Sequence, residues 1–398
     1  MKPFYLVAVF LFCGLFSFSQ TYNTDVEDII NDVNLDSLTY YLRNLSGEDP
    51  VVVNGQTTTI EHRVSNWGND LAAEYIYETM QGFGYEVTMQ DYAANGKNVY
   101  AVKEGSLYPD DYYMICAHYD AVDYYCADDN ASGTTAVLEA ARIFKDLDFE
   151  YSIVFALWDE EEIGLIGSYY YANDANNNDQ SILGVINMDM ISWDGDGDNE
   201  FEIHTSFTSN SDDLADYVVQ INNIYNLPLE PSIENPGTTA SDHASFWSNN
   251  FAAILLIEEY YGGDFNPYYH TELDRISILD MEYFHNMSKL SIGTLASLAM
   301  PDNTISVEER FANSSLELNC YPNPSNGKTN ISVMLKEEGN LKVSLLNSMG
   351  QKVKHICDDY QLQGENNFEF NTSELIPGIY LLVASSTKGN ATFKLLVQ

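Results

Sequence analysis

Four short apolar runs, separated by longer segments, are the feature that most constrains the fold of this chain. The runs are Tyr112–Ala117, Ile153–Trp158, Ile182–Met188 and Ala252–Ile257. Between the first two, apolar residues from Ala136 to Phe144 recur at helical spacing. Buried strands that alternate with helices predict α/β crossovers and a largely parallel sheet flanked by helices. In such sheets, chemistry gathers just beyond the carboxyl ends of the strands.

Histidines and acidic residues stand close after these predicted strands. They are His118, Asp120, Asp128, the run Asp159–Glu162, Asp189 and His270. Imidazole and carboxylate together suit Zn²⁺, and two histidines with three carboxylates can hold two such ions if one carboxylate bridges them. Two ions about 3.5–4 Å apart polarise a carbonyl and generate a hydroxide at neutral pH. We therefore predict a two-metal site with His118, Asp128, Glu162, Asp189 and His270 as ligands.

Each of these residues also has a structural alternative. Asp128 and its neighbours could cap the helix that starts near Ala131. Glu160–Glu162 could be a solvated charge run, and His270 a hydrogen-bonded loop residue. The metal site is favoured because all five ligands fall at the same edge of one predicted sheet. Asp120 is placed to accept the second imidazole N–H of the first histidine and so to fix its tautomer.

Six motifs in this order resemble the M28 family of zinc aminopeptidases across about residues 60–300. They are His118-Tyr-Asp120, Ala127-Asp-Asp-Asn-Ala-Ser-Gly133, Glu161-Glu-Ile-Gly-Leu-Ile-Gly-Ser168, Asn187-Met-Asp189-Met, Ser241-Asp-His243 and Asn266-Pro-Tyr-Tyr-His270-Thr271. The resemblance implies a phosphorylase/hydrolase-like α/β fold with a co-catalytic zinc pair. By position, His118 and Asp189 would bind one zinc, Glu162 and His270 the other, and Asp128 would bridge them.

The same resemblance implies roles for further residues. Glu161 would be the general base that takes a proton from the metal-bound water and returns it to the leaving amine. Tyr269 would help to stabilise the oxyanion, although a shift of one residue would select Tyr268. Asp242 and His243 would support the site or pack beneath it.

The function expected from these features is that of a secreted di-zinc aminopeptidase. It would hydrolyse N-terminal residues from peptides through a metal-bound hydroxide. A glutaminyl-peptide cyclotransferase on the same fold would use one zinc, and retention of both His118 and Asp189 favours the two-metal hydrolase. A catalytically inactive surface binding protein is a third reading, but a degenerate site should have lost a ligand.

Both ends of the chain predict export. Residues 1–19 combine Lys2, an apolar run and small residues before Gln20, which is typical of a signal peptide. Residues 20–300 would form the peptidase domain and 301–317 a linker. Residues 318–398 contain short alternating segments with Gly, Pro and Asn between them, which predict a small β-sandwich.

The tail also resembles a known sorting domain. The motifs are Tyr321-Pro-Asn-Pro-Ser-Asn-Gly327, Asn347-Ser-Met-Gly350, Pro377-Gly-Ile-Tyr380 and Lys394-Leu-Leu-Val397. They are similar to the C-terminal sorting domain of the type IX secretion system of Bacteroidetes. The resemblance implies passage across the outer membrane with that secretion machinery as a partner, and release or display at the cell surface.

Composition excludes some partners. The chain has 17 basic and 60 acidic residues, a net charge of −43, which argues against nucleic acid and anionic membrane surfaces. The apolar run near the N-terminus is too short to span a bilayer and no similar run follows, so we expect no transmembrane segment.

Three smaller features remain open at this stage. Asp194–Glu200 has the oxygen spacing of a calcium loop but lacks the final glutamate, so a surface turn is favoured over a Ca²⁺ site. The Asn-rich segment Tyr171–Gln180 is expected to be a loop. Cys116 and Cys126 form one candidate disulfide pair that the sequence cannot decide.

Overall fold

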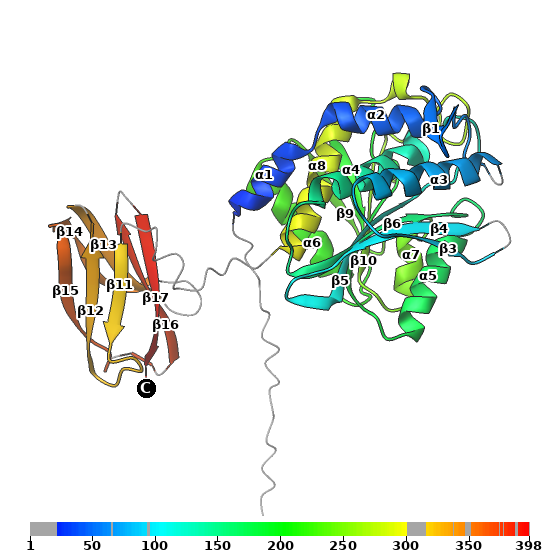
Figure 1. The fold of residues 1–398 in the computed structure, drawn as a ribbon. Helices are drawn as coiled ribbons and strands as arrows, with labels where there is room; N and C mark the ends of the chain where they lie inside the picture. The colour runs from blue at the N-terminus through cyan, green and yellow to red at the C-terminus, as the bar shows by residue number, and fades with distance from the viewer. Residues whose placement is uncertain are drawn as a thin grey trace, which may run out of the picture. The chain divides into compact units, whose positions relative to one another are not determined.

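The computed structural model describes residues 22–300 except 65–66 and 94–95, and residues 316–397 except 337, 347–351, 374, 377 and 387–388. The chain divides into two compact units, with the division after Pro301 (Figure 1). The predicted signal peptide and residues 301–315 of the predicted linker lie outside the described residues. The first strand of the second unit begins already at Leu316.

An eight-stranded mixed sheet forms the centre of the first unit, in the order β3-β4-β6-β5-β7-β10-β8-β9. Its strands are β3 (Val87–Asp91), β4 (Lys97–Lys103), β5 (Tyr108–His118), β6 (Tyr151–Trp158), β7 (Ser181–Met188), β8 (Glu200–His204), β9 (Glu230–Glu234) and β10 (Ala253–Ile257). The middle strands β6, β5, β7 and β10 are parallel neighbours. They are the four strands predicted from apolar runs, so the α/β fold is confirmed. The sequence did not indicate the outer strands, which carry more polar and exposed residues.

Helices cover both faces of this sheet (Figure 1). The larger helical layer contains α1 (Thr24–Asp32), α2 (Leu35–Leu45), α3 (Trp67–Gly82), α4 (Gly133–Phe144), α6 (Ser211–Tyr225) and α8 (Met281–Ala299). Their buried faces share one apolar core with the sheet. On the other face, α5 (Ile166–Asn177) and α7 (His243–Ser248) pack on a second core around Trp158. A hairpin of β1 (Val51–Val53) and β2 (Gln56–Thr58) and two short helical turns, η1 (Ala127–Ser132) and η2 (Ile276–Ile278), complete the unit.

The expectation of a loop at Tyr171–Gln180 was wrong, because α5 continues through Asn177. The asparagines lie on its outer side. Tyr171, Ala172 and Ala175 form a buried stripe, and the Tyr171 ring lies 4.9 Å from the Trp158 ring. Burial of this stripe on the sheet outweighs the low helix propensity of asparagine, as tertiary packing commonly does.

The second unit consists of two antiparallel sheets, in the orders β11-β12-β15 and β14-β13-β16-β17. Its strands are β11 (Leu316–Tyr321), β12 (Lys328–Leu335), β13 (Gly339–Leu346), β14 (Lys352–Gln361), β15 (Gly364–Asn371), β16 (Gly378–Ser386) and β17 (Gly389–Val397). Alternating residues such as Ile331 and Val333 of β12 and Leu341 and Val343 of β13 point into a separate apolar core. The alternating segments of the tail, residues 330–335, 341–346, 367–370 and 378–384, lie within β12, β13, β15 and β16, which confirms the small β-sandwich.

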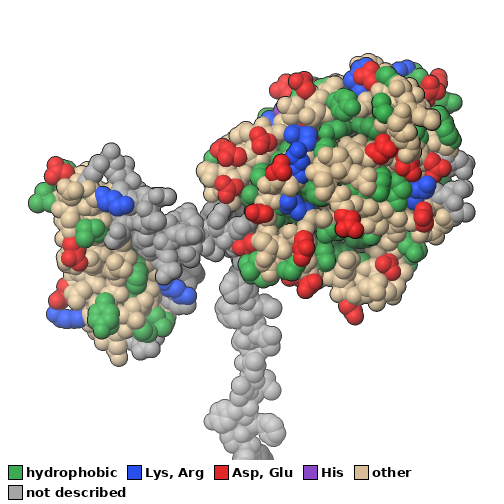
Figure 2. All heavy atoms as spheres, in the orientation of Figure 1, with side chains coloured by type: hydrophobic (Ala, Val, Ile, Leu, Met, Phe, Trp, Pro, Cys, Tyr) green, Lys and Arg blue, Asp and Glu red, His purple; other side chains and the backbone are tan. Residues whose placement is uncertain are grey.

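The surface is acidic over a broad area. On the face that Figure 2 shows, acidic side chains are spread over the first unit and do not gather in one patch. Within the described part of the chain, none of the helices has both the length and the apolar character that a membrane span needs.

Gly133 at the start of α4 lets this helix approach the ends of the central strands. A Cβ atom there would lie 2.5 Å from Asn130 Oδ1 and 2.6 Å from the Met188 carbonyl oxygen. We expect Gly133→Ala to lower the free energy of unfolding by about 1–3 kcal/mol, because overpacking outweighs the better helix propensity of alanine. Urea denaturation measures the change.

Gly82 provides the matched control, because it ends α3 and a Cβ atom there meets nothing within 4 Å. Gly82→Ala should be neutral or stabilising. Equal effects of the two substitutions would contradict the close approach at Gly133.

Candidate metal centre

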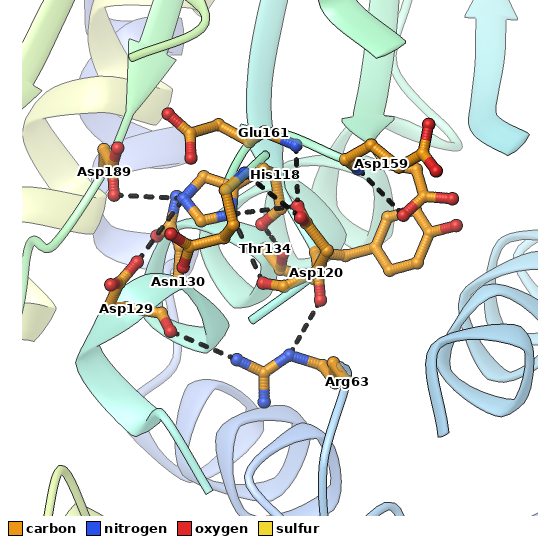
Figure 3. A network of polar contacts seen from close by, with 12 residues as sticks. Arg63, His118, Asp120, Asp129, Asn130, Thr134, Asp159, Glu161 and Asp189 are labelled. Atoms are coloured by element: carbon orange, nitrogen blue, oxygen red, sulfur yellow. Dashed lines mark hydrogen bonds and ion pairs between the residues drawn. The ribbon is translucent and has the colours of Figure 1, made fainter. Parts of the chain in front are cut away.

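The predicted site residues converge at the carboxyl edge of the central strands. β5 ends in His118, β6 runs into Asp159–Glu162, and β7 runs into Asp189. Because these three strands are parallel neighbours, their following residues meet at one edge of the sheet. The His118 Nε2 and Asp189 Oδ1 atoms are 3.3 Å apart (Figure 3). His270 reaches the same place from the loop after β10, with its Nε2 atom 3.1 Å from Glu162 Oε2.

Asp129, and not Asp128, lies between the two histidines. One carboxylate oxygen of Asp129 is 3.5 Å from His118 Nε2, and the other is 3.1 Å from His270 Nε2. The Asp128 carboxylate instead accepts hydrogen bonds from the Ser192 hydroxyl at 2.6 Å and the Asn266 amide at 2.9 Å. The structure therefore places Asp129, one residue after the predicted bridging residue Asp128, between the two histidines.

The run Asp128–Asn130 thus divides three tasks among three neighbouring residues. Backbone angles at Asp129 and Asn130 are not helical, so successive side chains turn in different directions. Asn130 Oδ1 accepts a hydrogen bond from the Gly133 N–H at 2.9 Å and caps α4. The run therefore contains a helix-capping residue, Asn130, and a carboxylate directed to the two histidines, that of Asp129.

Two buried aspartates orient the backbone of the acidic segments. The Asp120 carboxylate accepts hydrogen bonds from the N–H groups of Glu161 and Glu162 at 3.1 and 3.2 Å. Asp274 accepts from the N–H groups of Asp128 and Asp129, also at 3.1 Å. Hydrogen bonds to a carboxylate are strong, so each pair positions the side chain that follows. Sequence reasoning missed Asp274, which stands in no motif that marked it.

Asp120 also lies where the sequence predicted it relative to His118. The His118 Nδ1 atom is 3.3 Å from Asp120 Oδ1 and 3.3 Å from the Asp120 carbonyl oxygen. Contact at Nδ1 leaves Nε2 facing the carboxylates of Asp129 and Asp189. This is the arrangement in which one ring nitrogen is held and the other serves as a ligand.

The side chains fit a pair of zinc ions. His118, Asp129 and Glu162 bring one ligand atom each within 4.8 Å of one another, and His118, Glu161 and Asp189 do the same. Asp129 Oδ2 is buried, 3.1 Å from His270 Nε2. Glu162 Oε1 is buried and has no hydrogen-bond partner among the described residues. Such oxygens are costly to bury unless a cation or a donor satisfies them. Imidazole and carboxylate donors in this ratio match the preferences of Zn²⁺.

The electrostatics of the cluster point to the same need for positive charge. Burial and the nearby Glu162 carboxylate raise the pKa of Asp129 to about 8. Burial alone would lower the pKa of His270, but its hydrogen bonds to Asp129 and Glu162 raise that pKa to about 10. Burial also lowers the pKa of His118, but the carboxylates of Asp189 and Glu161 raise it more, so that this pKa lies well above its usual value. In the absence of a metal cation, the cluster therefore binds protons, and a bound cation would neutralise the carboxylates in their place.

Glu161 belongs to the group with His118 and Asp189, and it is 9% exposed. Burial raises the pKa of Glu161 well above its usual value, partly offset by the nearby His118. A carboxylate with a raised pKa in a site of this kind is suited to accept and return a proton.

The two adjacent tyrosines differ in their surroundings. The Tyr269 ring stacks on the His270 ring with centroids 3.6 Å apart, and it is 39% exposed. Burial and the charge of Asp129 raise the pKa of Tyr269, which keeps its hydroxyl protonated. Tyr268 packs instead against Trp193, with ring centroids 6.1 Å apart. Of the two, Tyr269 lies beside the acidic cluster.

Arg63 is a further site residue that the sequence did not mark. Among the described residues, its fully buried guanidinium donates hydrogen bonds to backbone carbonyl oxygens. They include that of Tyr119 at 2.8 Å. The carbonyl oxygen of Asp129 accepts at 3.4 Å (Figure 3). The guanidinium also donates to Leu45 at 2.7 Å, Tyr125 at 2.8 Å and Cys126 at 2.7 Å. A single arginine in a polar segment carries no periodicity or motif that would have identified it.

The remaining predicted features lie around this centre. Asp242 and His243 are fully buried, and His243 Nε2 is 2.9 Å from the Thr238 carbonyl oxygen. Cys116 and Cys126 are free thiols, as are the other two described cysteines.

The acidic turn after Trp193 brings Asp194, Asp196 and Asp264 together at the surface. The Asp194 carboxylate accepts from the Gly197 and Asn199 N–H groups at 2.8 and 3.1 Å. These bonds serve the surface turn that the sequence favoured, and calcium binding there stays a prediction.

Two family models match separate parts of the chain. Residues 98–295 match peptidase family M28, and residues 319–398 match a secretion system C-terminal sorting domain. These are the resemblances expected from the motifs, and both are confirmed. The sorting domain indicates that the chain is exported from the cell.

Curated relatives and solved structures agree with this family match. A probable leucine aminopeptidase of Arthroderma benhamiae is 28% identical over 184 residues, which is 44% of this chain and 49% of that protein. The chain thus spans about half the length of the curated relatives it matches.

Among solved structures, the LapA aminopeptidase of Legionella pneumophila has a TM-score of 0.62 at 21% identity, covering 75% of this chain and 79% of that one. A glutaminyl cyclase of Bacteroides thetaiotaomicron has a TM-score of 0.54 at 18% identity, covering 66% and 97%. At these identities the likeness establishes the fold.

Arg63 should contribute strongly to stability, because its removal leaves several buried carbonyl groups without a donor. We expect Arg63→Met to lower the free energy of unfolding by about 3 kcal/mol or more, since each unsatisfied buried group costs about 1–3 kcal/mol. Arg63→Lys should cost less, because the ammonium keeps the charge and three donors. Chemical denaturation measures both.

Arg43 is the matched control, because it pairs with Asp49 at the surface and its side chain is 38% exposed. Arg43→Met should cost at most about 1 kcal/mol. If Arg63→Met lowered the free energy of unfolding no more than this, the hydrogen bonds from Arg63 to the backbone carbonyl groups would not be a major source of stability.

Proposed function

We propose, because residues 98–295 match peptidase family M28, that this chain is a secreted aminopeptidase that uses two zinc ions. It releases N-terminal residues from peptides and proteins. The observation that carries the proposal is the position of the Asp129 carboxylate between His118 and His270, with one oxygen directed to each. A carboxylate between two histidines, with one oxygen directed to each, is an arrangement suited to a pair of metal ions.

We assign the ligands by these contacts. His118 and Asp189 would hold one zinc ion, Glu162 and His270 would hold the other, and Asp129 would contribute to both. When bound, the two ions supply Lewis acidity toward the scissile carbonyl and lower the pKa of a water molecule. Asp120 and Asp274 keep the ligand segments in place through their backbone N–H bonds.

The proton transfers fall to Glu161. It takes a proton from the attacking water and returns that proton to the leaving amine, so the peptide bond is cleaved without net proton loss. The Tyr269 hydroxyl donates a hydrogen bond to the oxyanion that forms at the scissile carbonyl. The surrounding carboxylates favour the protonated or metal-bound N-terminal amine of the substrate.

We further propose that residues 1–19 are a signal peptide and that the sorting domain is the substrate of the type IX secretion machinery. The peptidase then acts at the cell surface or outside the cell. The sorting unit carries no catalytic residue of this mechanism.

Two other functions give different outcomes in the same assay. A glutaminyl cyclase would close the ring of an N-terminal glutamine without hydrolysis, and the shared fold makes this the nearest enzyme alternative. An inactive binding protein would do neither. The two histidine half-sites favour the hydrolase, because a one-zinc cyclase has no need of both.

The test is release of amino acids from a panel of aminoacyl chromogenic substrates by the full-length protein, beginning with leucine. Activity should stop with a chelator and return with Zn²⁺. Glu161→Gln should lower kcat by about 10²–10⁴-fold with zinc content unchanged, because only the proton transfer is lost. Ring closure without hydrolysis, or full activity of Glu161→Gln, would refute the corresponding part of the proposal.

Asp128 and Asp129 offer a matched pair for the bridging role. Asp129→Asn should reduce the zinc content measured by mass spectrometry from two ions per chain toward one or none, because the amide cannot bridge two cations. Asp128→Asn should keep the zinc content, since its carboxylate contacts Ser192 and Asn266. The reverse pattern would return the bridge to Asp128.

A further inference from the structure

We propose that a pocket beside Glu162 binds the side chain of the second residue of the substrate peptide and favours an apolar side chain. The inference rests on the proposed aminopeptidase function and names a part of the substrate that the family match does not specify. It concerns the residue on the leaving side of the scissile bond.

The pocket opens next to the metal centre. Its volume is about 220 Å³, and its lining includes Val64, Asn69, Asp120, Val122, Glu162 and Ile163. Glu162 also forms part of the metal cluster through its contact with His270. The pocket and the metal centre therefore share a wall, and a substrate bound at one reaches the other.

The segment that forms this wall identifies which substrate residue enters. Glu161 returns its proton to the leaving amine, and the pocket is lined by Glu162 and Ile163, the next residues along the same segment. Asp120 holds the N–H groups of Glu161 and Glu162, so the base and the pocket wall keep a constant spacing. The leaving amine carries the second residue of the peptide, whose side chain thus lies on the pocket side.

A second group of side chains near the centre is aromatic. Phe265 packs on Tyr269 with ring centroids 5.2 Å apart, and Tyr260 packs on Phe265 at 5.6 Å. The Tyr269 ring connects this group to the centre, because it stacks on the His270 imidazole. This aromatic cluster provides a separate surface for the side chain of the first substrate residue. The pocket at Glu162 is then available for the side chain of the second substrate residue.

The chemistry of the pocket favours an apolar occupant. Ile163 is 66% exposed and Val122 is 37% exposed, although both are large hydrophobic residues. Exposed apolar side chains gathered at a site mark a binding surface. The carboxylate of Asp159 at the same pocket is already held by Asn69 at 2.7 Å and by the Lys97 N–H at 3.0 Å. The acidic groups of the wall should disfavour an acidic second residue.

The experiment compares dipeptides that differ only in the second residue. With the best-cleaved first residue X from the panel above, kcat/KM is measured for X-Leu, X-Gly, X-Asp and the amide X-NH₂, whose leaving group has no side chain. We expect X-Leu to exceed X-Gly about tenfold or more, since one apolar side chain in a pocket gives discrimination of this order. X-Asp should be the poorest dipeptide.

Substitution of the pocket wall tests the location. Ile163→Ser should lower the ratio of kcat/KM for X-Leu to that for X-NH₂ several-fold, and Val122→Ser should act in the same direction. Ile163 is mostly exposed, so its substitution leaves a folded protein for measurement. Leu183→Ser is the control, because Leu183 is 39% exposed near the opposite end of β7 and should leave the ratio unchanged.

Three outcomes would overturn the inference. The first is equal cleavage of X-Leu and X-Gly by the wild-type protein. The second is a wild-type preference that Ile163→Ser and Val122→Ser leave intact. The third is that Ile163→Ser or Val122→Ser changes the preference for the first residue, measured with a series of amino acid amides. That result would assign the pocket to the first residue. Failure of the proposed function is distinct, because none of the substrates, including X-NH₂, would then be cleaved.

Discussion

The buried guanidinium of Arg63 is the interaction on which the architecture of the site depends. It binds carbonyl oxygens at the end of α2, after β5 and along the segment that leads to Asp129. Two of its acceptors are the carbonyl oxygens of Tyr125 and Cys126, residues whose φ angles are positive, at 67° and 42°. Backbone in this region is unfavourable for residues other than glycine and persists only where the surroundings hold it. Arg63 thereby links the strand that ends in His118 with the loop that presents Asp129.

The buried positive charge of Arg63 also offsets the negative charge of the acidic residues around it. The carboxylates of Asp120, Asp129 and Asp274 lie close enough to raise the pKa of Arg63, although burial lowers it more. Arg63 therefore moderates the negative potential beneath the metal centre without occupying any carboxylate oxygen. The oxygens of Asp129 and Glu162 stay available on the other side, where the cluster would take up metal cations.

The sequence predicted the parts of this molecule that depend on local pattern. The four central strands are buried on both faces, so each forms a continuous apolar run. The strands β3, β8 and β9 lie toward the edges and mix polar with apolar residues, which gave no such signal. Helix α5 was missed because its asparagines obscure a narrow buried stripe.

At the site, proximity to the sheet edge could be predicted, but side-chain direction could not. Asp128 and Asp129 are neighbours of identical type, and only the non-helical turn at Asp129 decides which of them faces the histidines. Arg63 and Asp274 act on backbone groups distant in the chain, so no sequence spacing records their partners. Such contacts become visible only when the fold brings the segments together.

The order of strands in the sheet has a consequence for how the protein matures. The candidate ligands stand after β5, β6, β7 and β10, and His118 and His270 are separated by most of the catalytic unit. Bringing such distant segments together costs loop-closure entropy, and metal binding by two ligands alone does not offset this cost early in folding. In a short zinc module the ion organises the chain, whereas here the sheet must form first. A cation taken up at the proposed site would therefore be the last component to bind, in a scaffold whose shape is already complete.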